Sequence, residues 1–452
     1  MTTAITIGMI IIYVAIMMGI GVYTARQTRS VSDFVLGSHS VGSWLTAFAY
    51  GTSYFSAVVF IGYAGQFGWT YGVSAAWVGV GNALLGSLLA WIVLGRRTRI
   101  MTQSLGAKTM PEYFEKRWNS KGLKIAAALI VFVFLIPYTA SVYNGLSRLF
   151  NMAFQIESEG AYKIIIIVMA LLTAIYVILG GYAATAINDF IQGIVMLIGI
   201  AAVVICAIQN QGGLTSALAA LGEIEVNGKT NTLNSVFGPD PLNLLGVVIL
   251  TSLGTWGLPQ MIHKFYAIKS ENDIKKGAVI STVFALIVAG GSYLLGGFDR
   301  LFCTLTEDGS GKTVISTLSN GKPDFDAMIP SLLHTALPDI LIGLVVVLVL
   351  SASMSTLSSL VLTSSSTLTI DLIKPNLKKC SDKKEMLIMR VLIAVFLIIS
   401  VLLAFNKNAS ISTLMSYSWG ALAGAFLGPF MYGLFSRKIT KPAVWTSFIL
   451  GI

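Results

Sequence analysis

Charged residues are scarce in this chain of 452 residues: Asp, Glu, Lys and Arg make up 11% of it, whereas 55% of the residues are hydrophobic. So few ionisable groups could not cover so much apolar mass in water, which excludes an ordinary soluble protein. Cysteine is also scarce, and the three that occur are too far apart for a disulfide framework or a metal site. Nucleophile motifs, Walker loops and glycine-rich dinucleotide turns are absent from the sequence, so neither an enzyme nor an ATP-driven pump is expected.

Long apolar runs are abundant instead. Runs of about 20 residues can each cross roughly 30 Å of hydrocarbon as a helix, and they lack the alternation of barrel strands. The fold class is therefore predicted to be an all-α polytopic membrane protein. Eleven full spans are expected, at residues 4–24, 43–66, 73–95, 125–154, 161–181, 182–207, 241–263, 277–298, 338–370, 386–405 and 411–436. A further span starts at 442 and is expected to be truncated, because 442–452 is too short to cross.

The distribution of basic residues indicates how the chain is oriented. Of the 30 Lys and Arg residues, 23 fall in alternate gaps between spans, at 25–42, 96–124, 264–276, 374–390 and 437–441. By the positive-inside rule these gaps face the cytoplasm, which puts the N-terminus outside and the protein in the cell membrane. The net charge of +10 thus reflects membrane orientation, and no nucleic-acid partner is expected.

Two spans carry more polar residues, glycine and proline than a helix facing lipid would tolerate. The centre of the second reads Ala-Tyr-Gly-Thr-Ser-Tyr-Phe-Ser-Ala over 49–57, and the seventh reads Thr-Ser-Leu-Gly-Thr-Trp-Gly-Leu-Pro-Gln over 251–260. Small residues can simply permit close helix packing. The two interrupted spans are the second and the seventh, and this odd offset inverts the second group of spans relative to the first. The pattern instead indicates an inverted-repeat transporter with a binding site at the membrane midplane.

This organisation predicts five segments along the chain. They are a leading helix with an inner linker at 1–42, a first repeat at 43–207, an external loop at 208–240, a second repeat at 241–436 and the start of a further span at 437–452. The external loop and a second external gap at 299–337 are expected to be linkers, with a role as lids as the alternative.

Oxygen-bearing groups line one face of the ninth span, where Ala352, Ser355, Thr356 and Ser359 stand at i, i+3, i+4 and i+7. Hydroxyl and carbonyl oxygens without a carboxylate suit a singly charged hard cation such as Na⁺. The alternative is that the hydroxyls bond back to carbonyls one turn earlier. Asp189, within an otherwise apolar helix, is a functional candidate by default; a solvated position near the inner membrane surface is its alternative.

Three segments resemble the sodium:solute symporter family, in order and at matching spacing. They are Asp-Phe-Val-Leu-Gly at 33–37, Gly-Gly-Tyr at 180–182 leading to Asn-Asp-Phe-Ile-Gln at 188–192, and Met-Ser-Thr at 354–356 leading to Ser364, Ser365 and Asp371. The resemblance is nearest to the sodium/proline and sodium/pantothenate branches. It implies a LeuT-type fold, in which one leading helix precedes two inverted five-helix repeats. It also implies Na⁺-coupled uptake of a small organic solute by alternating access.

The resemblance further implies which residues form the sites. A first Na⁺ site would take carbonyl oxygens of Thr52, Phe55 and Ala352 and hydroxyls of Ser355 and Thr356. A second Na⁺ site, found in only some members, would use Asp189, Ser355, Ser358 and Ser359, so one Na⁺ is expected and two are the alternative. The solute would lie against Ser53, Tyr54, Ser56, Tyr138, Thr255, Trp256 and Gln260.

The expected solute is an amino acid such as proline or a small monocarboxylate such as pantothenate. Thr251 and Thr255 stand where the proline branch has an aromatic-lined pocket, and Tyr54 replaces its acidic residue. Val58 and Val59 stand where sugar carriers have a polar pair, and the fourth span lacks the central arginine of sialic acid carriers. Symport of a sugar or sialic acid, a proton-coupled carrier, a passive sodium channel and a solute sensor remain alternatives. The expected partners are the solute, Na⁺ and the lipid bilayer, and a monomer is expected to suffice.

Overall fold

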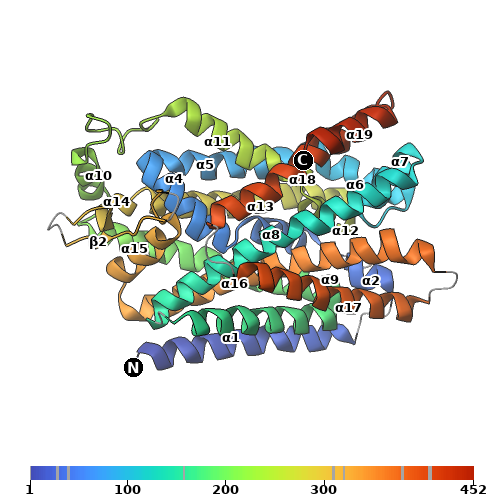
Figure 1. The fold of residues 1–452 in the computed structure, drawn as a ribbon, viewed down its shortest axis with the longest axis horizontal. Coiled ribbons are helices and arrows are strands. Elements are labelled where there is room, and N and C mark those ends of the chain that lie inside the picture. Colours follow the sequence, from blue (N-terminus) through green and yellow to red (C-terminus); the bar gives the residue numbers. More distant parts are fainter. Residues whose placement is uncertain are drawn as a thin grey trace.

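The computed structural model describes residues 2–26, 30–37, 41–155, 158–307, 311–318, 321–377, 381–405 and 410–452. Within these ranges the chain is almost wholly helical (Figure 1), and its strands form one short parallel pair, β1 Cys303–Thr304 and β2 Thr313–Val314. The all-α class predicted from the apolar runs is therefore confirmed.

Helices occupy all eleven stretches that are predicted to span the membrane. Up to residue 210 the elements are α1 Thr2–Ala25, α2 Val31–Leu36, α3 Ser43–Tyr54, the π-helical η2 Val58–Tyr63, α4 Ala64–Tyr71, the 3₁₀ turn η3 Gly72–Ala75, α5 Ala76–Gly81, the π-helical η4 Asn82–Leu89 and η5 Trp91–Gly95, α6 Arg96–Leu105, α7 Met110–Trp118, α8 Lys121–Phe154 and α9 Glu159–Asn210. The remaining elements are α10 Leu214–Glu223, α11 Pro241–Leu253, the 3₁₀ turn η6 Gly254–Gly257, α12 Pro259–Ala267, α13 Glu271–Gly296, α14 Asp299–Phe302, the 3₁₀ turn η7 Phe325–Ala327, α15 Met328–Ala336, α16 Asp339–Thr367, the π-helical η8 Leu368–Ile373, the 3₁₀ turn η9 Lys374–Asn376, α17 Asp382–Ala404, α18 Ile411–Phe435 and α19 Lys441–Leu450.

Seven helical stretches in the described ranges are long and apolar enough to cross a membrane, or eight when the bent pair formed by α11 and α12 counts as one span. Two of them have length for two crossings each, with 48 residues at Val58–Leu105 and 52 at Glu159–Asn210. The second turns at Gly181, where the fifth and sixth predicted spans meet. The backbone there has φ 56° and ψ −146°, and an added Cβ would lie 2.7 Å from the Phe34 carbonyl oxygen, so the turn requires glycine.

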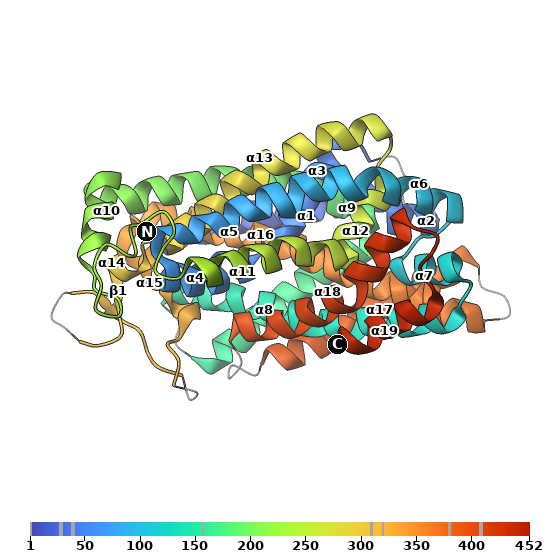
Figure 2. The same cartoon turned by 90° about the horizontal axis from the view of Figure 1, so that it is seen from above.

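The two ends of the helix bundle are covered by different elements (Figures 1 and 2). The short elements α10, α14 and α15 gather at one end, and α2, α6 and α7 gather at the other. The second end carries basic residues such as Arg96 and Lys116, so it is the end that the positive-inside rule predicts to be cytoplasmic. Each of the two segments expected to be linkers contains a short helix with buried side chains, among them Ala217 and Leu221 of α10 and Leu333 of α15. Helices of ten and nine residues are too short to give a clear periodic signal in the sequence.

Both helix breaks predicted from the sequence are present. Helix α3 ends at Tyr54, the backbone at Phe55 is extended with φ −106° and ψ 111°, and helical structure resumes at Val58. The segment α11–η6 leads to an extended Leu258, after which α12 leaves at an angle of 53°. Proline at the first position of α12 has no backbone N–H group. This costs little, because an N–H at the first position of a helix has no partner within the helix. Irregular backbone therefore lies among packed helices, where it can line a binding site.

Candidate cation and solute site

Helix α16 presents its stripe of hydroxyl groups to the break in α3. The Ser355 hydroxyl donates a hydrogen bond of 2.8 Å to Thr52 Oγ1, a residue 303 positions earlier in the chain. Thr356 Oγ1 lies 3.1 Å from Ala352 O, one turn back on its own helix, and 3.4 Å from Thr52 O on the other helix. All four residues, and Phe55 at the break, are buried. The structure thus gathers the residues predicted for the first Na⁺ site at one place.

The oxygen atoms at this junction have the chemistry of a site for a monovalent cation. Thr356 does bond back to its own helix, as the alternative interpretation of the stripe requires, but back-bonding does not account for its contact with Thr52. The extended backbone at Phe55 removes that carbonyl from the helical hydrogen-bond pattern. Carbonyl and hydroxyl oxygens without a carboxylate suit Na⁺ better than a divalent ion.

A buried ion pair lies next to this junction, one turn further along α16. Lys264 Nζ on α12 is 3.6 Å from Asp189 Oδ2 on α9 and donates a hydrogen bond of 2.9 Å to Ser359 Oγ. The Lys264 side chain is 3% exposed and that of Asp189 is fully buried. The alternative for Asp189, a solvated position near the inner membrane surface, is therefore wrong, because its side chain is fully buried beside Lys264.

Lys264 is the functional candidate that sequence reasoning missed. Its position at the start of the gap 264–276 groups it with the cytoplasmic lysines, but α12 carries it into the interior. Its neighbours Ile262 and Phe265 are apolar and buried. These apolar neighbours are the feature of the sequence that indicates a buried lysine at position 264. Its partner Asp189 lies in a different repeat of the predicted organisation, so only the folded chain pairs them.

The other residues predicted for a second Na⁺ site, Ser355, Ser358 and Ser359, lie within one stretch of α16 next to this ion pair. Ser358 Oγ donates a hydrogen bond of 2.8 Å to the carbonyl oxygen of Ser355. The Ser359 hydroxyl, besides accepting from Lys264, is hydrogen-bonded at 2.8 Å to the Ser53 hydroxyl. Ser53, a predicted solute contact, therefore faces the ion pair in this conformation.

Aromatic rings gather on the other side of the α3 break. The Trp419 indole of α18 stacks on Tyr54, with ring centroids 6.1 Å apart and planes 11° from parallel, and meets Tyr138 edge-on at 6.1 Å. A groove of about 440 Å³ between α11 and α18 leads to Trp419, and Tyr63 and Thr251 also line it. Tyr54 and Tyr138 are predicted solute residues, whereas Trp419 enters the site only through its tertiary contacts.

Polar groups around these rings fall into two sets. Thr255 Oγ1 donates to the Ser252 carbonyl at 2.8 Å, Trp256 Nε1 donates to the Leu85 carbonyl at 3.1 Å, and Ser56 Oγ accepts from the backbone N–H of Val58 at 3.2 Å. These three predicted solute residues are thus bonded to backbone groups in this conformation.

The second set has spare hydrogen-bonding capacity. In the part of the chain that the structure describes, both polar atoms of the Gln260 amide are buried without a hydrogen-bond partner, and the Tyr138 hydroxyl interacts with the Trp419 indole and with Ser56. Buried polar groups are normally paired, and unpaired groups require an explanation such as a bound ligand or water. Tyr138, Gln260 and Trp419 are therefore candidates for contact with a polar solute.

Comparison with known proteins identifies the family. A model of the sodium:solute symporter family matches residues 34–451. The chain belongs to this family. Two sodium/proline symporters, from Staphylococcus aureus strains JH9 and COL, are each 30% identical in sequence to this chain. Each alignment covers 98% of this chain and 83% of the relative. The symporter is a multi-pass protein of the plasma membrane that couples solute transport to Na⁺, and it is not an enzyme.

Two solved structures share the fold of the symporter. One is a Na⁺-coupled sialic acid symporter in a substrate-bound outward-open state, with a TM-score of 0.72 and 19% identity over 95% of this chain and 87% of that one. The other is Mhp1, a transporter of the nucleobase-cation-symport-1 family, with a TM-score of 0.52 and 14% identity over 91% of this chain and 82% of that one. The LeuT-type fold implied by the sequence resemblance is therefore confirmed.

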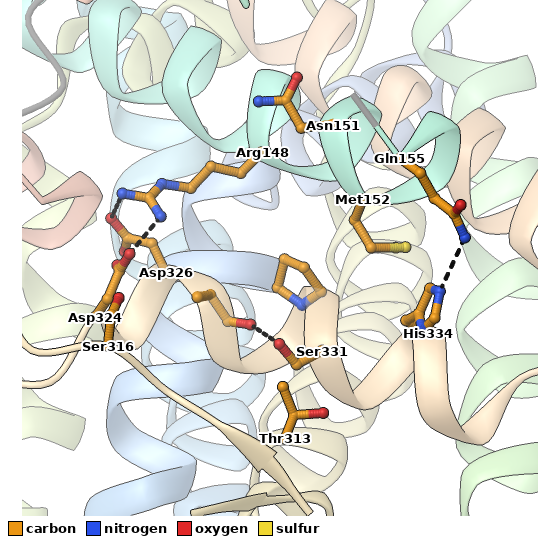
Figure 3. Close-up of a pocket in the computed structure, with 12 residues that line it drawn as sticks. Arg148, Asn151, Met152, Gln155, Thr313, Ser316, Asp324, Asp326, Ser331 and His334 are labelled. Atoms are coloured by element: carbon orange, nitrogen blue, oxygen red, sulfur yellow. Dashed lines mark hydrogen bonds and ion pairs between the residues drawn. The ribbon is translucent and has the colours of Figure 1, made fainter. Parts of the chain in front are cut away.

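An ion-pair cluster forms one wall of a cavity of about 980 Å³ at the end of the bundle that is predicted to be external (Figure 3). Arg148 of α8 forms a bond of 2.8 Å with Asp324 and lies 3.8 Å from Asp326, both of which belong to the segment between α14 and α15. Asp326 also accepts a hydrogen bond of 2.9 Å from the backbone N–H of Ile411, where α18 begins. The cluster thus ties three parts of the external surface together.

Asp326 gives the stability of this external cluster a pH dependence. Burial raises the pKa of Asp326 to about 6, against the opposing effect of the Arg148 guanidinium. The folded chain therefore binds this proton more tightly than the unfolded chain, so Asp326 adds stability as pH falls from about 6 towards 4, by up to about 3 kcal/mol. We expect the melting temperature of the wild type to rise relative to that of Asp326→Asn when pH falls from 7.5 to 5. Glu225→Gln, on an exposed external residue, is the control, and melting curves of wild type and Asp326→Asn that move in parallel would contradict the assignment.

Proposed function

We propose that the symporter carries one Na⁺ together with a small amino acid, with proline as the first candidate, by alternating access. The observation that carries the proposal is the junction of α3 and α16, where Ser355 and Thr356 bond to Thr52 at the helix break. The similarity to sodium/proline symporters at 30% identity supports an amino acid as solute. The substitutions at Tyr54, Thr251 and Thr255 relative to the proline branch make a direct test of the solute necessary.

In the proposed mechanism Na⁺ is held by the carbonyl oxygens of Thr52, Phe55 and Ala352 and the hydroxyls of Ser355 and Thr356. Na⁺ would replace the direct hydrogen bond between Ser355 and Thr52 as the link between the two helices. Helix α3 belongs to the first predicted repeat, 43–207, and α16 to the second, 241–436. An ion that needs oxygen atoms from both helices binds best when α3 and α16 are adjacent, and so it favours that conformation. This difference in Na⁺ affinity between conformations couples Na⁺ binding to the conformational change.

The solute is proposed to bind between the aromatic rings and the spare polar groups beside the α3 break. The faces of Tyr54 and Trp419 offer an apolar surface for a compact ring or side chain. The Tyr138 hydroxyl and the Gln260 amide offer hydrogen bonds for charged or polar ends of the solute. Such a mixture suits a small amphipathic molecule of amino-acid size.

The free energy of one Na⁺ is sufficient for strong accumulation. One Na⁺ that moves down about 100 mV and a tenfold concentration gradient yields about 3.7 kcal/mol, enough for roughly 500-fold accumulation of a solute without net charge.

The test is uptake of radiolabelled proline by proteoliposomes with an inward Na⁺ gradient. We expect saturable accumulation that disappears when choline replaces Na⁺ or when an ionophore collapses the gradient, at fixed pH. Equal uptake in Na⁺ and choline would remove Na⁺ as the driving ion. Competition by unlabelled amino acids, pantothenate, sialic acid and glucose then ranks solutes, and a Na⁺-dependent hit other than proline would reassign the solute while leaving the coupling intact.

A further inference from the structure

The Lys264 ammonium lies inside a set of groups that would otherwise suit a cation. It donates a hydrogen bond of 2.9 Å to Ser359 Oγ, lies 3.6 Å from Asp189 Oδ2, and is 5.4 Å from the centre of the Tyr182 ring. Asp189 and Ser359 are buried, and the Ser355 hydroxyl also interacts with the Asp189 carboxylate. A carboxylate, a hydroxyl and an aromatic face around one buried point are typical of a cation site.

These groups overlap the set implied for a second Na⁺. Ser355, Ser358 and Ser359 stand at i, i+3 and i+4 on α16 and would share a second ion with Asp189. In the structure Lys264 takes the Ser359 oxygen and balances the Asp189 charge, while Ser358 bonds to the Ser355 carbonyl. A second positive ion here would be buried beside the ammonium with one carboxylate for two charges, which is strongly unfavourable in an apolar interior. The residues present therefore do not fit a second Na⁺.

We propose that the Lys264 ammonium is a tethered cation that takes the place of a second Na⁺, so that the symporter binds one Na⁺ per transport cycle. Because the ammonium stays covalently attached, it contributes no ion gradient to transport. The ammonium instead holds α12 against α9 and α16. Without it, a bound diffusible ion would have to link these helices. The role of Lys264 in transport rests on the proposed function. The number of Na⁺ ions bound to the chain can be measured without transport.

The experiment counts Na⁺ ions bound to the purified full chain in detergent, by equilibrium binding of radiolabelled Na⁺ without solute. We expect the wild type to bind one ion at saturation. Lys264→Gln leaves Asp189, Ser358 and Ser359 without a cation, so its count should rise to two. Lys264→Arg keeps the charge and should bind one. Lys269→Gln, which changes an exposed lysine just beyond α12, is the matched control and should also bind one.

A second readout covers the case in which Lys264→Gln folds poorly. Its unpaired Asp189 carboxylate should make it less stable than the wild type in K⁺, and Na⁺ should restore its melting temperature far more than that of the wild type. The double variant Lys264→Gln/Asp189→Asn should lose this Na⁺ dependence and return to one bound ion.

Two Na⁺ ions bound to the wild type would overturn the inference without recourse to any variant. A count of one for Lys264→Gln, with no extra stabilisation by Na⁺, would overturn it as well. The two proposals can fail separately. One bound Na⁺ with no Na⁺-driven uptake of any solute would contradict the proposed function alone, whereas a wild type that binds no Na⁺ would contradict both.

Discussion

Replacing Ser355 and Thr356 together by alanine should raise the Na⁺ concentration for half-maximal uptake by at least about 100-fold. The double variant removes two of the five proposed ligands and both contacts from α16 to Thr52. A hydrogen bond or ligand bond to a charged group contributes about 1.5–3 kcal/mol, so two of them correspond to roughly 100-fold or more in affinity. The measurement is the initial rate of solute uptake against Na⁺ concentration in proteoliposomes.

Ser353→Ala is the matched control for this experiment. Ser353 is a buried hydroxyl on the same helix, two residues before Ser355, and it makes no hydrogen bond to α3 in the described ranges. Its removal should leave the Na⁺ dependence unchanged. If Ser355→Ala/Thr356→Ala keeps the wild-type Na⁺ dependence, these hydroxyls do not bind the ion.

Asp189→Asn should be the most destabilising single substitution at the site. Asparagine has nearly the same shape as aspartate but leaves the Lys264 ammonium buried without a counter-charge. Breaking a buried ion pair in this way costs about 3–5 kcal/mol, whereas removing both charges is often close to neutral. We therefore expect a large loss of melting temperature in detergent for Asp189→Asn, and recovery of most of it in Asp189→Asn/Lys264→Gln.

An exposed ion pair provides the comparison for Asp189 and Lys264. Lys163 and Glu159 lie 2.8 Å apart at the start of α9, with side chains 42% and 68% exposed. Exposed pairs of this kind contribute about 0–1 kcal/mol, so Glu159→Gln should change the melting temperature little. An Asp189→Asn variant as stable as Glu159→Gln would mean that Lys264 does not depend on Asp189 for its counter-charge.

Much of the fold could be predicted because its signals are local. The breaks near Phe55 and Leu258 follow from small residues, hydroxyls and a proline within apolar spans, and the helical spacing of Ser355 and Thr356 places them on one face. The turn at Gly181 coincides with a boundary between predicted spans. These features depend on neighbours within a few residues, which a single sequence displays.

The parts that escaped prediction depend on contacts between distant segments. Lys264 looks like a cytoplasmic lysine until the bend at Leu258 directs α12 into the interior towards Asp189. Trp419 is not among the residues predicted to bind the solute, and its stacking on Tyr54 is a contact between segments far apart in the sequence. Ser53 is a neighbour of Tyr54 in the sequence, yet their side chains face the ion pair and the aromatic groove respectively.

The most direct test is an experimental structure of the purified symporter in Na⁺ and another in choline, both at a resolution that shows ordered water. A cation peak between Thr52, Ala352 and Ser355 in Na⁺, and its loss in choline, is the expected result. Absence of a peak there in Na⁺, or an α16 whose hydroxyls do not face the α3 break, would contradict the proposal that these two helices bind the coupling ion.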